Sequence, residues 1–143
     1  MRAPEPTNPP AHLADRIRAD RAGMEGERKQ VTILFADLVD SMELARRIDP
    51  EDWRSIMDRF FRLLADGVHD LEGNVNDFTG DGIMAIFGAP IAHEDHARRA
   101  CLAALKVQRD IAVFGEEFQR THGLELAIRI GRASCRERVL TGV

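Results

Sequence analysis

The sequence has no long apolar run, no excess of basic residues and few cysteines. No stretch approaches the roughly 20 apolar residues of a membrane-spanning helix, and the N-terminus lacks the apolar segment of a signal peptide. The net charge is −4, whereas nucleic-acid-binding domains favour a cationic face. Two cysteines give no disulfide framework, and Cys101 lies in a helical pattern that predicts a small core residue. We therefore expect a cytoplasmic domain with no membrane and no nucleic-acid partner.

The chain does contain enough apolar material for one domain, preceded by a segment of different character. Hydrophobic residues make up 44% and charged residues 31% of the 143 positions. Four prolines among the first ten residues exclude regular structure there. Ala11–Ala22 predicts a short charged helix with Leu13 and Ile17 on one face. We expect residues 1–29 to be a disordered or helical linker.

A strand pattern and two helical patterns follow the linker. Val31–Leu38 is a nearly continuous apolar run, as in a strand buried on both faces. Ser41–Arg47 fits a short helix. A longer helix starts where Asp49 can cap and Pro50 suits the first turn, and it ends near Gly73. Its apolar stripe, predicted to face the core or a dimer contact, consists of Trp53, Ile56, Met57, Phe60, Phe61, Leu64, Val68 and Leu71.

The second half of the domain predicts a hairpin, a long helix and a strand. The turn at 80–82 joins two strand-like runs, Asn74–Thr79 and Ile83–Phe87. A long helix is expected over Glu94–Thr121 and a strand over Leu124–Ile130. The predicted order of elements is βααββαβ, an α/β chain.

Two aspartates stand at the ends of these strand-like runs. Asp37 follows one run and Asp81 precedes another, so both carboxylates are expected to be rigidly held and open to solvent. Mg²⁺ prefers one or two carboxylates together with substrate phosphates, so the pair could form a metal–nucleotide site. Both residues could equally be turn residues, because Asp is common before helices and in hairpins. The spacing alone leaves both interpretations open.

The chain resembles the first part of a class III nucleotidyl cyclase catalytic domain. The matching segments are KQVTILFADLVDS, GNVNDFTGDGIMAIFGAPIAHEDHARRA and LAIRIG, in this order, within Arg28–Ile130. The chain is most similar to cyclase modules at the front of large bacterial regulators that carry an ATPase and helical repeats. The resemblance implies a ferredoxin-like α+β sandwich, here truncated at its C-terminal side. It also implies a homodimer that converts ATP or GTP into a cyclic monophosphate and pyrophosphate.

The resemblance also implies roles for particular residues. Two Mg²⁺ or Mn²⁺ ions would be held by the catalytic residues Asp37 and Asp81 and by the carbonyl of Leu38. Asp77 occupies the base-selecting position, where the family has a lysine. An acid there could accept from an exocyclic amine or from guanine, or it could simply face solvent. The positions expected to bind phosphate are Val39, Asp40, Ser41 and Met42.

Two further departures from the family bear on activity. Asp40 stands where the family usually has glycine, and its charge would repel a triphosphate unless it faces solvent as an N-cap. The family's later Asn and Arg, which stabilise the transition state, have no counterpart in these 143 residues. We therefore expect either a cyclase whose metal-binding portion is represented here or a decayed nucleotide-sensing or dimerisation module. The 143-residue chain alone is expected to be inactive.

The histidines do not point to a separate site. His93 and His96 have a spacing that could support a metal on a helix, but the HEDH run lies where the family begins its long helix. His12, His69 and His122 are isolated, and we expect them on the surface.

The last residues differ from the rest of the domain. Residues 131–143 show neither strand alternation nor a helical stripe, and the run IGRASCRERV resembles a translated sequencing adapter. We expect the cyclase domain to cover residues 30–130 and the tail to be an assembly artefact. The alternative is a basic tail that binds an acidic partner.

Overall fold

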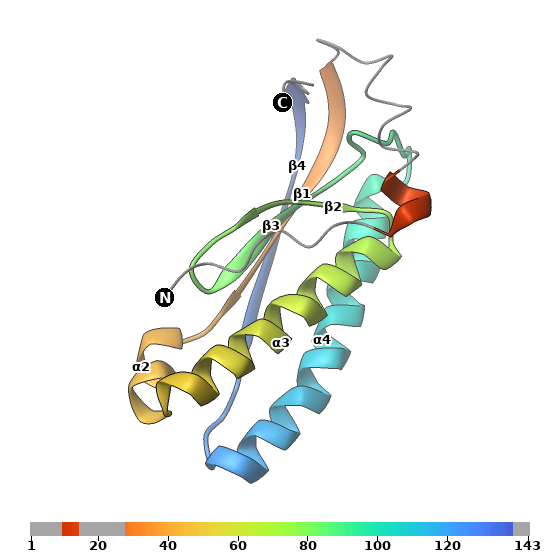
Figure 1. Ribbon diagram of the computed structural model, residues 1–143. Helices are drawn as coiled ribbons and strands as arrows, with labels where there is room; N and C mark the ends of the chain where they lie inside the picture. The colour runs from red at the N-terminus through yellow and green to blue at the C-terminus, as the bar shows by residue number, and fades with distance from the viewer. Residues whose placement is uncertain (1–9, 15–27, 139–143) are drawn as a thin grey trace.

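The computed structural model describes residues 10–14 and 28–138. A helical turn at 11–14 precedes the domain. The elements are β1 (Arg28–Leu38), α2 (Ser41–Arg47), α3 (Pro50–Asp70), β2 (Asn74–Phe78), β3 (Gly82–Phe87), α4 (His96–His122) and β4 (Ile128–Arg138) (Figure 1). This order confirms the predicted βααββαβ arrangement and the α+β fold class.

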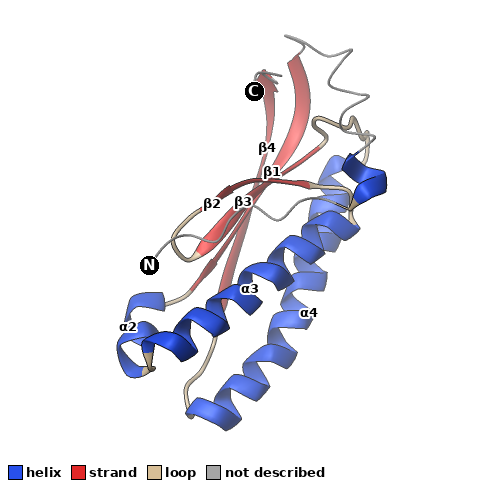
Figure 2. Ribbon diagram, viewed as in Figure 1, coloured by secondary structure: helices blue, strands red, loops and turns tan. Residues whose placement is uncertain are grey.

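The four strands form one antiparallel sheet in the order β2-β3-β1-β4. The central strand β1 therefore pairs with β3 on one side and with β4 on the other. Helices α3 and α4 lie side by side across one face of the sheet, and α2 lies at the end of β1 (Figure 2). This arrangement buries the apolar stripes of both long helices against the sheet.

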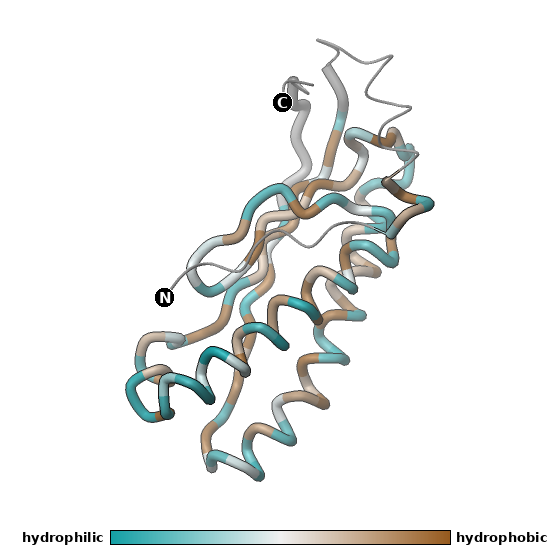
Figure 3. Tube along the Cα trace, viewed as in Figure 1, coloured by the Kyte–Doolittle hydropathy of each residue, from teal (hydrophilic) through white to brown (hydrophobic). Residues whose placement is uncertain are grey.

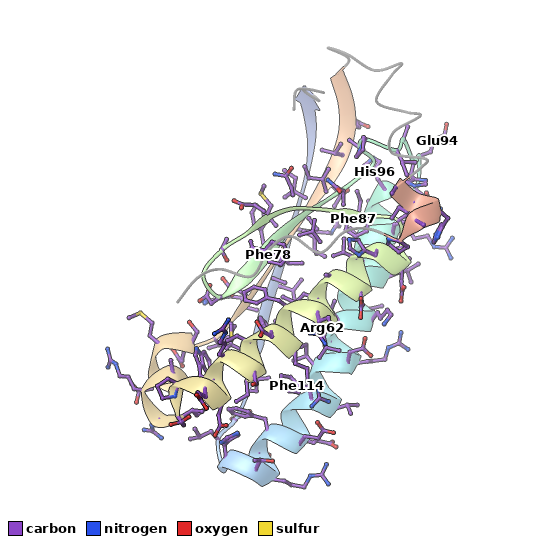
Figure 4. All side chains as sticks on the ribbon, in the orientation of Figure 1. Arg62, Phe78, Phe87, Glu94, His96 and Phe114 are labelled. Carbon is purple, nitrogen blue, oxygen red and sulfur yellow. The ribbon has the colours of Figure 1, made fainter. Side chains whose placement is uncertain are left out.

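The core lies between that sheet face and the two helices. Trp53, Met57, Phe60 and Phe61 of α3 are all buried, which confirms them as core residues. Phe78 of β2 packs edge-on against Phe61, with ring centroids 5.5 Å apart (Figure 4). On α4 the buried stripe consists of Ala100, Ala103, Val107, Ile111, Phe114 and Phe118.

The helix boundaries follow local capping chemistry. The Asp49 side chain accepts a hydrogen bond from the Glu51 backbone N–H, and Pro50 occupies the first turn of α3, as predicted. Helix α4 begins two residues after the expected Glu94 and ends at Gly123, whose φ of 68° suits glycine. The helical turn at 11–14 agrees with part of the helix expected over Ala11–Ala22, and the rest of that helix lies outside the described residues.

The second sheet face is covered by neither α3 nor α4. Side chains of β1 and β3 alternate, so Ile33 and Phe35 share this outer face with Met84 and Ile86. Phe35 is 47% exposed there. Strand β3 and the middle of β1 are largely apolar, whereas the helices alternate between apolar and polar residues (Figure 3). The outer face is therefore an apolar surface on the part of the sheet next to Asp37.

Strand β4 differs from its predicted extent. It starts at Ile128 instead of Leu124 and continues to Arg138, paired with the whole of β1. The expectation that no strand follows residue 130 is therefore wrong for residues 131–138. The backbone N–H and C=O groups of residues 131–138 pair with β1 whatever the side chains are, so side-chain periodicity could not reveal this part of the strand. Residues 139–143 lie outside the described residues, and the origin of the tail stays a prediction.

Two residues differ in burial from the sequence-based expectation. Cys101 is exposed on α4, because it lies one position off the buried stripe at Ala100. His69 is buried in the last turn of α3, where only 8% of the residue is exposed. Both errors arise from a helix position that sequence alone assigned to the wrong face. Among the helices of the described residues, none is both long and apolar enough to span a bilayer.

The buried His69 predicts acid sensitivity of the fold. Burial lowers the pKa of His69 below its ordinary 6.5, although the charges of Asp66 and Asp70 oppose that shift. The folded chain therefore favours the neutral imidazole, and its contribution to stability is lost as the pH falls from 6.5 towards the lowered pKa. We expect His69→Gln to flatten the pH dependence of the free energy of unfolding in that window, measured by urea denaturation. His12→Gln, which removes an exposed histidine, is the control, and an equal flattening in both variants would contradict the prediction.

Candidate metal and nucleotide site

The fold brings the two predicted aspartates to adjacent strands. In the register of β1 and β3, Asp37 lies opposite Gly82, directly after Asp81 in the chain. The backbone N–H of Leu38 donates to the carbonyl of Asp81 over 2.9 Å. Backbone pairing therefore holds together the two segments that carry these carboxylates, with Asp37 on β1 and Asp81 in the turn directly before β3, although they lie 44 positions apart in sequence.

This pairing depends on the absence of a side chain at Gly82. A Cβ atom there would lie 2.7 Å from Asp37 Cα and would overlap the carbonyl of Ala36. A Cβ atom at Gly80 would meet nothing within 4 Å. The close approach of β3 to β1 therefore explains Gly82, one of the two glycines that flank Asp81.

The two carboxylates have different partners. The Ser41 hydroxyl donates to Asp81 Oδ2 over 2.9 Å, from the first residue of α2. Arg129 lies opposite Asp37 in the register of β1 and β4, and its Nε donates to Asp37 Oδ1 over 3.1 Å. The Asp37 side chain is 44% exposed, and Asp81 is also partly exposed. Both are within reach of a solvent-borne ligand.

Sequence reasoning did not identify Arg129 as part of this site. Its only signal was a place in the matching segment LAIRIG, and no spacing rule connects it with Asp37. The connection comes from the antiparallel pairing of β1 with β4, which sets Arg129 beside Asp37 across 92 positions of sequence. Ser41 was predicted to bind phosphate, and the structure places its hydroxyl on Asp81.

The turn between β1 and α2 offers fewer backbone donors than the sequence predicted. The N–H of Val39 donates to the carbonyl of Ala127 over 2.9 Å and is engaged there. Asp40 is exposed at the N-cap position of α2 with φ 53° and makes no hydrogen bond to the helix through its side chain. A left-handed conformation favours glycine, which is the residue that the cyclase resemblance implies at this position. Met42 is 72% exposed at the start of α2.

The predicted base-selecting residue lies on the same side of the sheet as the aspartates. Asp77 is exposed on β2 opposite Met84, directly after a β-bulge. Because Met84 belongs to the outer sheet face, Asp77 faces the same side as Asp37. Its role in base selection stays a prediction.

His93 and His96 do not share a partner. Nε2 of His93 lies 3.1 Å from Glu72 Oε2, whereas Nδ1 of His96 hydrogen-bonds the buried Thr32 hydroxyl over 2.7 Å. Both line a cavity of about 370 Å³ where α4 begins, beside Glu94 (Figure 4). Within the described ranges, no three or more His, Cys, Asp or Glu side chains are grouped so that they could hold a metal. The aspartate pair is therefore a site of two carboxylates, to which a backbone carbonyl could add.

An antiparallel sheet with two helices on one face and paired strand-end carboxylates is the class of domain that the sequence resemblance implied. Comparison with known proteins gives the same answer. Residues 24–141 match the family described as the adenylate and guanylate cyclase catalytic domain. The chain therefore belongs to this family.

Sequence relatives share only this portion of their length. Adenylate cyclase 1 of Rhizobium meliloti is 32% identical over 110 residues, which are 76% of this chain and 16% of that protein. An uncharacterized protein of Mycobacterium tuberculosis is 37% identical over 78 residues, 54% of this chain and 14% of that protein. The chain thus spans about a sixth of the curated relatives that it matches.

Solved structures show the same fold. The adenylyl cyclase CyaB from P. aeruginosa superposes with a TM-score of 0.74 at 21% identity, covering 79% of this chain and 59% of that one. The guanylyl cyclase Cya2 superposes with a TM-score of 0.72 at 27% identity, covering 79% and 57%. The resemblance read from the sequence is confirmed at the level of family and fold.

The close approach at Gly82 predicts an asymmetry between the two glycines of the turn. Gly82→Ala should destabilise the chain by about 1–3 kcal/mol, because its Cβ would meet backbone atoms of β1 that have no room to shift. Gly80→Ala should change the free energy of unfolding by less than about 0.5 kcal/mol, because its Cβ would face open space. Urea denaturation of both variants measures the difference in the free energy of unfolding. Equal effects would show that the close strand contact at Gly82 does not require glycine.

Proposed function

We propose that this domain is the metal-binding portion of a purine nucleotide cyclase. In the proposed reaction the ribose 3′-hydroxyl of ATP or GTP attacks the α-phosphate, and pyrophosphate leaves. The observation that carries the proposal is that Asp37, on β1, and Asp81, in the turn directly before β3, are brought together by backbone pairing in a chain of the cyclase family. We expect the domain to work in the cytoplasm, where its triphosphate substrate is found.

The oxygen donors at this site fit a hard divalent cation. Asp37 and Asp81 supply partly exposed carboxylates, and Leu38, whose N–H bonds the Asp81 carbonyl, would add its own carbonyl as a backbone ligand. Mg²⁺ and Mn²⁺ both favour such oxygen ligands together with substrate phosphates. When bound, two such ions would lower the pKa of the attacking hydroxyl and neutralise charge on the triphosphate.

The chain's own residues would orient these ligands. The Ser41 hydroxyl fixes one oxygen of Asp81, so the other oxygen remains for a ligand. Backbone pairing at Gly82 holds both aspartates to the strand ends, where a triphosphate can approach from solvent. Asp40, Ser41 and Met42 lie where the phosphates are expected, and the charge of the exposed Asp40 opposes an anion there.

A homodimer would complete the site. The outer sheet face carries the exposed Phe35 together with Ile33, Met84 and Ile86, and Asp37 and Asp77 belong to the same face. A second subunit covering this apolar face would therefore lie against the aspartates. Structures of similar fold at 23–24% identity include a guanylyl cyclase domain from Blastocladiella emersonii, described in one case as a non-canonical dimer and in another as monomeric, and a domain from Catenaria anguillulae in complex with GTP. The homodimer proposed for this chain therefore depends on the apolar outer face itself.

A decayed cyclase-like module is the second candidate. Its support is the pair of acidic residues, Asp77 at the base-selecting position and Asp40 beside the phosphates, both of them exposed. In that case the domain would sense nucleotide or dimerise without turnover. This alternative would be favoured if a full-length protein that contains this domain binds nucleotide but does not form cyclic nucleotide.

The domain limits are part of the same proposal. We propose a linker at residues 1–29, a cyclase portion at 30–130 and an artefact at 131–143, although β1 already begins at Arg28, β4 continues to Arg138 and the family match covers residues 24–141. Genomic DNA read by an independent method through the codons after Ile130 tests the last assignment. Native sequence that encodes this tail without a break would refute it.

Removal of either aspartate should abolish binding of the metal–nucleotide complex. Asp37→Ala and Asp81→Ala delete a carboxylate ligand at a partly exposed strand end, so the fold should be retained. Isothermal titration of Mn²⁺–ATP against each variant measures the loss, and circular dichroism checks the fold. Asp58→Ala, which removes an exposed acid from α3, is the matched control and should bind like the unmodified chain. Unchanged binding in both site variants would refute the assignment.

The 143-residue chain should not form cyclic nucleotide by itself. The family's transition-state Asn and Arg have no counterpart in this sequence, and loss of groups aimed at developing charge costs about 3–4 kcal/mol each. The test is an assay of the purified chain with ATP and GTP in the presence of Mn²⁺. Cyclic AMP or cyclic GMP above a protein-free control would show that the catalytic groups have been misplaced.

A further inference from the structure

The two proposed metal ligands differ in the charge of their partners. Asp81 accepts from the neutral hydroxyl of Ser41, whereas Asp37 accepts from the guanidinium of Arg129. The Arg129 contact joins directly opposed residues of β1 and β4, so it needs no loop movement to form. The Arg129 side chain is 71% exposed, so it can move away from Asp37 without a steric barrier from the core. One carboxylate of the site is therefore already neutralised when no cation is bound.

We propose that Arg129 is a placeholder cation for Asp37, and that a divalent cation must compete with it. The proposal rests on the metal site proposed above and adds a positioning residue to it. The guanidinium supplies the Asp37 carboxylate with a counter-charge at the strand end next to the turn that carries Asp81. Arg129 would hold Asp37 in one orientation, and a divalent cation bound by Asp37 would displace the guanidinium.

This role has a measurable consequence for the metal alone. A competing ion pair weakens apparent metal affinity, so its removal should strengthen the binding of Mn²⁺ in the absence of nucleotide. For an exposed pair the expected gain is about two- to fivefold in Kd. Salt screens the exposed pair, so the difference between the chains should shrink as ionic strength rises.

The experiment compares Mn²⁺ binding to the 143-residue chain and its variants, measured by electron paramagnetic resonance of the free ion at low ionic strength. Arg129→Gln removes the guanidinium, and Arg129→Lys keeps a charge but not the Nε donor. Arg46→Gln on α2 is the matched control, because it removes the same charge from an exposed arginine outside this ion pair. Asp81→Asn, which removes a proposed metal ligand, shows how much of the measured Mn²⁺ binding depends on the Asp37–Asp81 site.

We expect Arg129→Gln to bind Mn²⁺ about two- to fivefold more tightly than the unmodified chain, Arg129→Lys to lie between them, and Arg46→Gln to leave Kd unchanged. A second readout is the nitrogen–proton resonance of Arg129 Nε, which should shift when Mg²⁺ is added to the unmodified chain. Equal or weaker binding by Arg129→Gln, or a resonance that Mg²⁺ does not move, would overturn the placeholder role. If that binding still disappears in Asp81→Asn, the metal site itself stands. Absence of Asp81-dependent Mn²⁺ binding in every variant would overturn both.

Discussion

The contact between β3 and β1 at Gly82 sets the position of every group in the proposed site. Because no Cβ separates the two strands there, Asp37 can lie opposite Gly82 and Leu38 can bond the Asp81 carbonyl. The same central strand fixes Arg129 through its other edge, since β4 pairs along all of β1. Strand register therefore determines which charges meet, and the helices contribute by burying one face of the sheet against their apolar stripes.

The site is rich in negative charge, and its stability depends on how that charge is distributed. Four aspartates lie in this region of the domain. Asp37 ends β1 and Asp40 follows it in the turn before α2, while Asp77 on β2 and Asp81 in the turn before β3 belong to the hairpin. Arg129 offsets Asp37 and Ser41 donates to Asp81, while Asp40 and Asp77 are exposed to water. Because water screens charges at exposed positions, repulsion among these acids lowers the free energy of unfolding only slightly. For a bound triphosphate the same acids matter more, because an anion would approach the side on which they lie.

Sequence patterns predicted most of the fold and both aspartates for identifiable reasons. The stripes of α3 and α4 repeat at helical spacing, and Asp49 with Pro50 marks a helix start by local chemistry. The errors fall where contacts between distant segments decide. His69 and Cys101 were assigned to the wrong environments, because one helical step of about 100° separates the buried from the exposed face. Arg129, the Val39 bond to Ala127 and the extension of β4 all depend on pairing across the sheet, which has no local signal.

If Asp37 and Asp81 hold metal as proposed, this chain carries the metal ligands without the Asn and Arg that the cyclase resemblance implies for the transition state. The chain covers 57–59% of two solved cyclase chains. Binding of a cation to two carboxylates requires only this register, whereas acceleration of the reaction requires groups aimed at charge that develops later. Affinity for metal and turnover of nucleotide should therefore be separable properties in this family. Phe35 lies two residues before Asp37 on the same face of β1. A partner that covers the apolar surface around Phe35 would therefore also exclude water from Asp37, which links metal affinity to turnover.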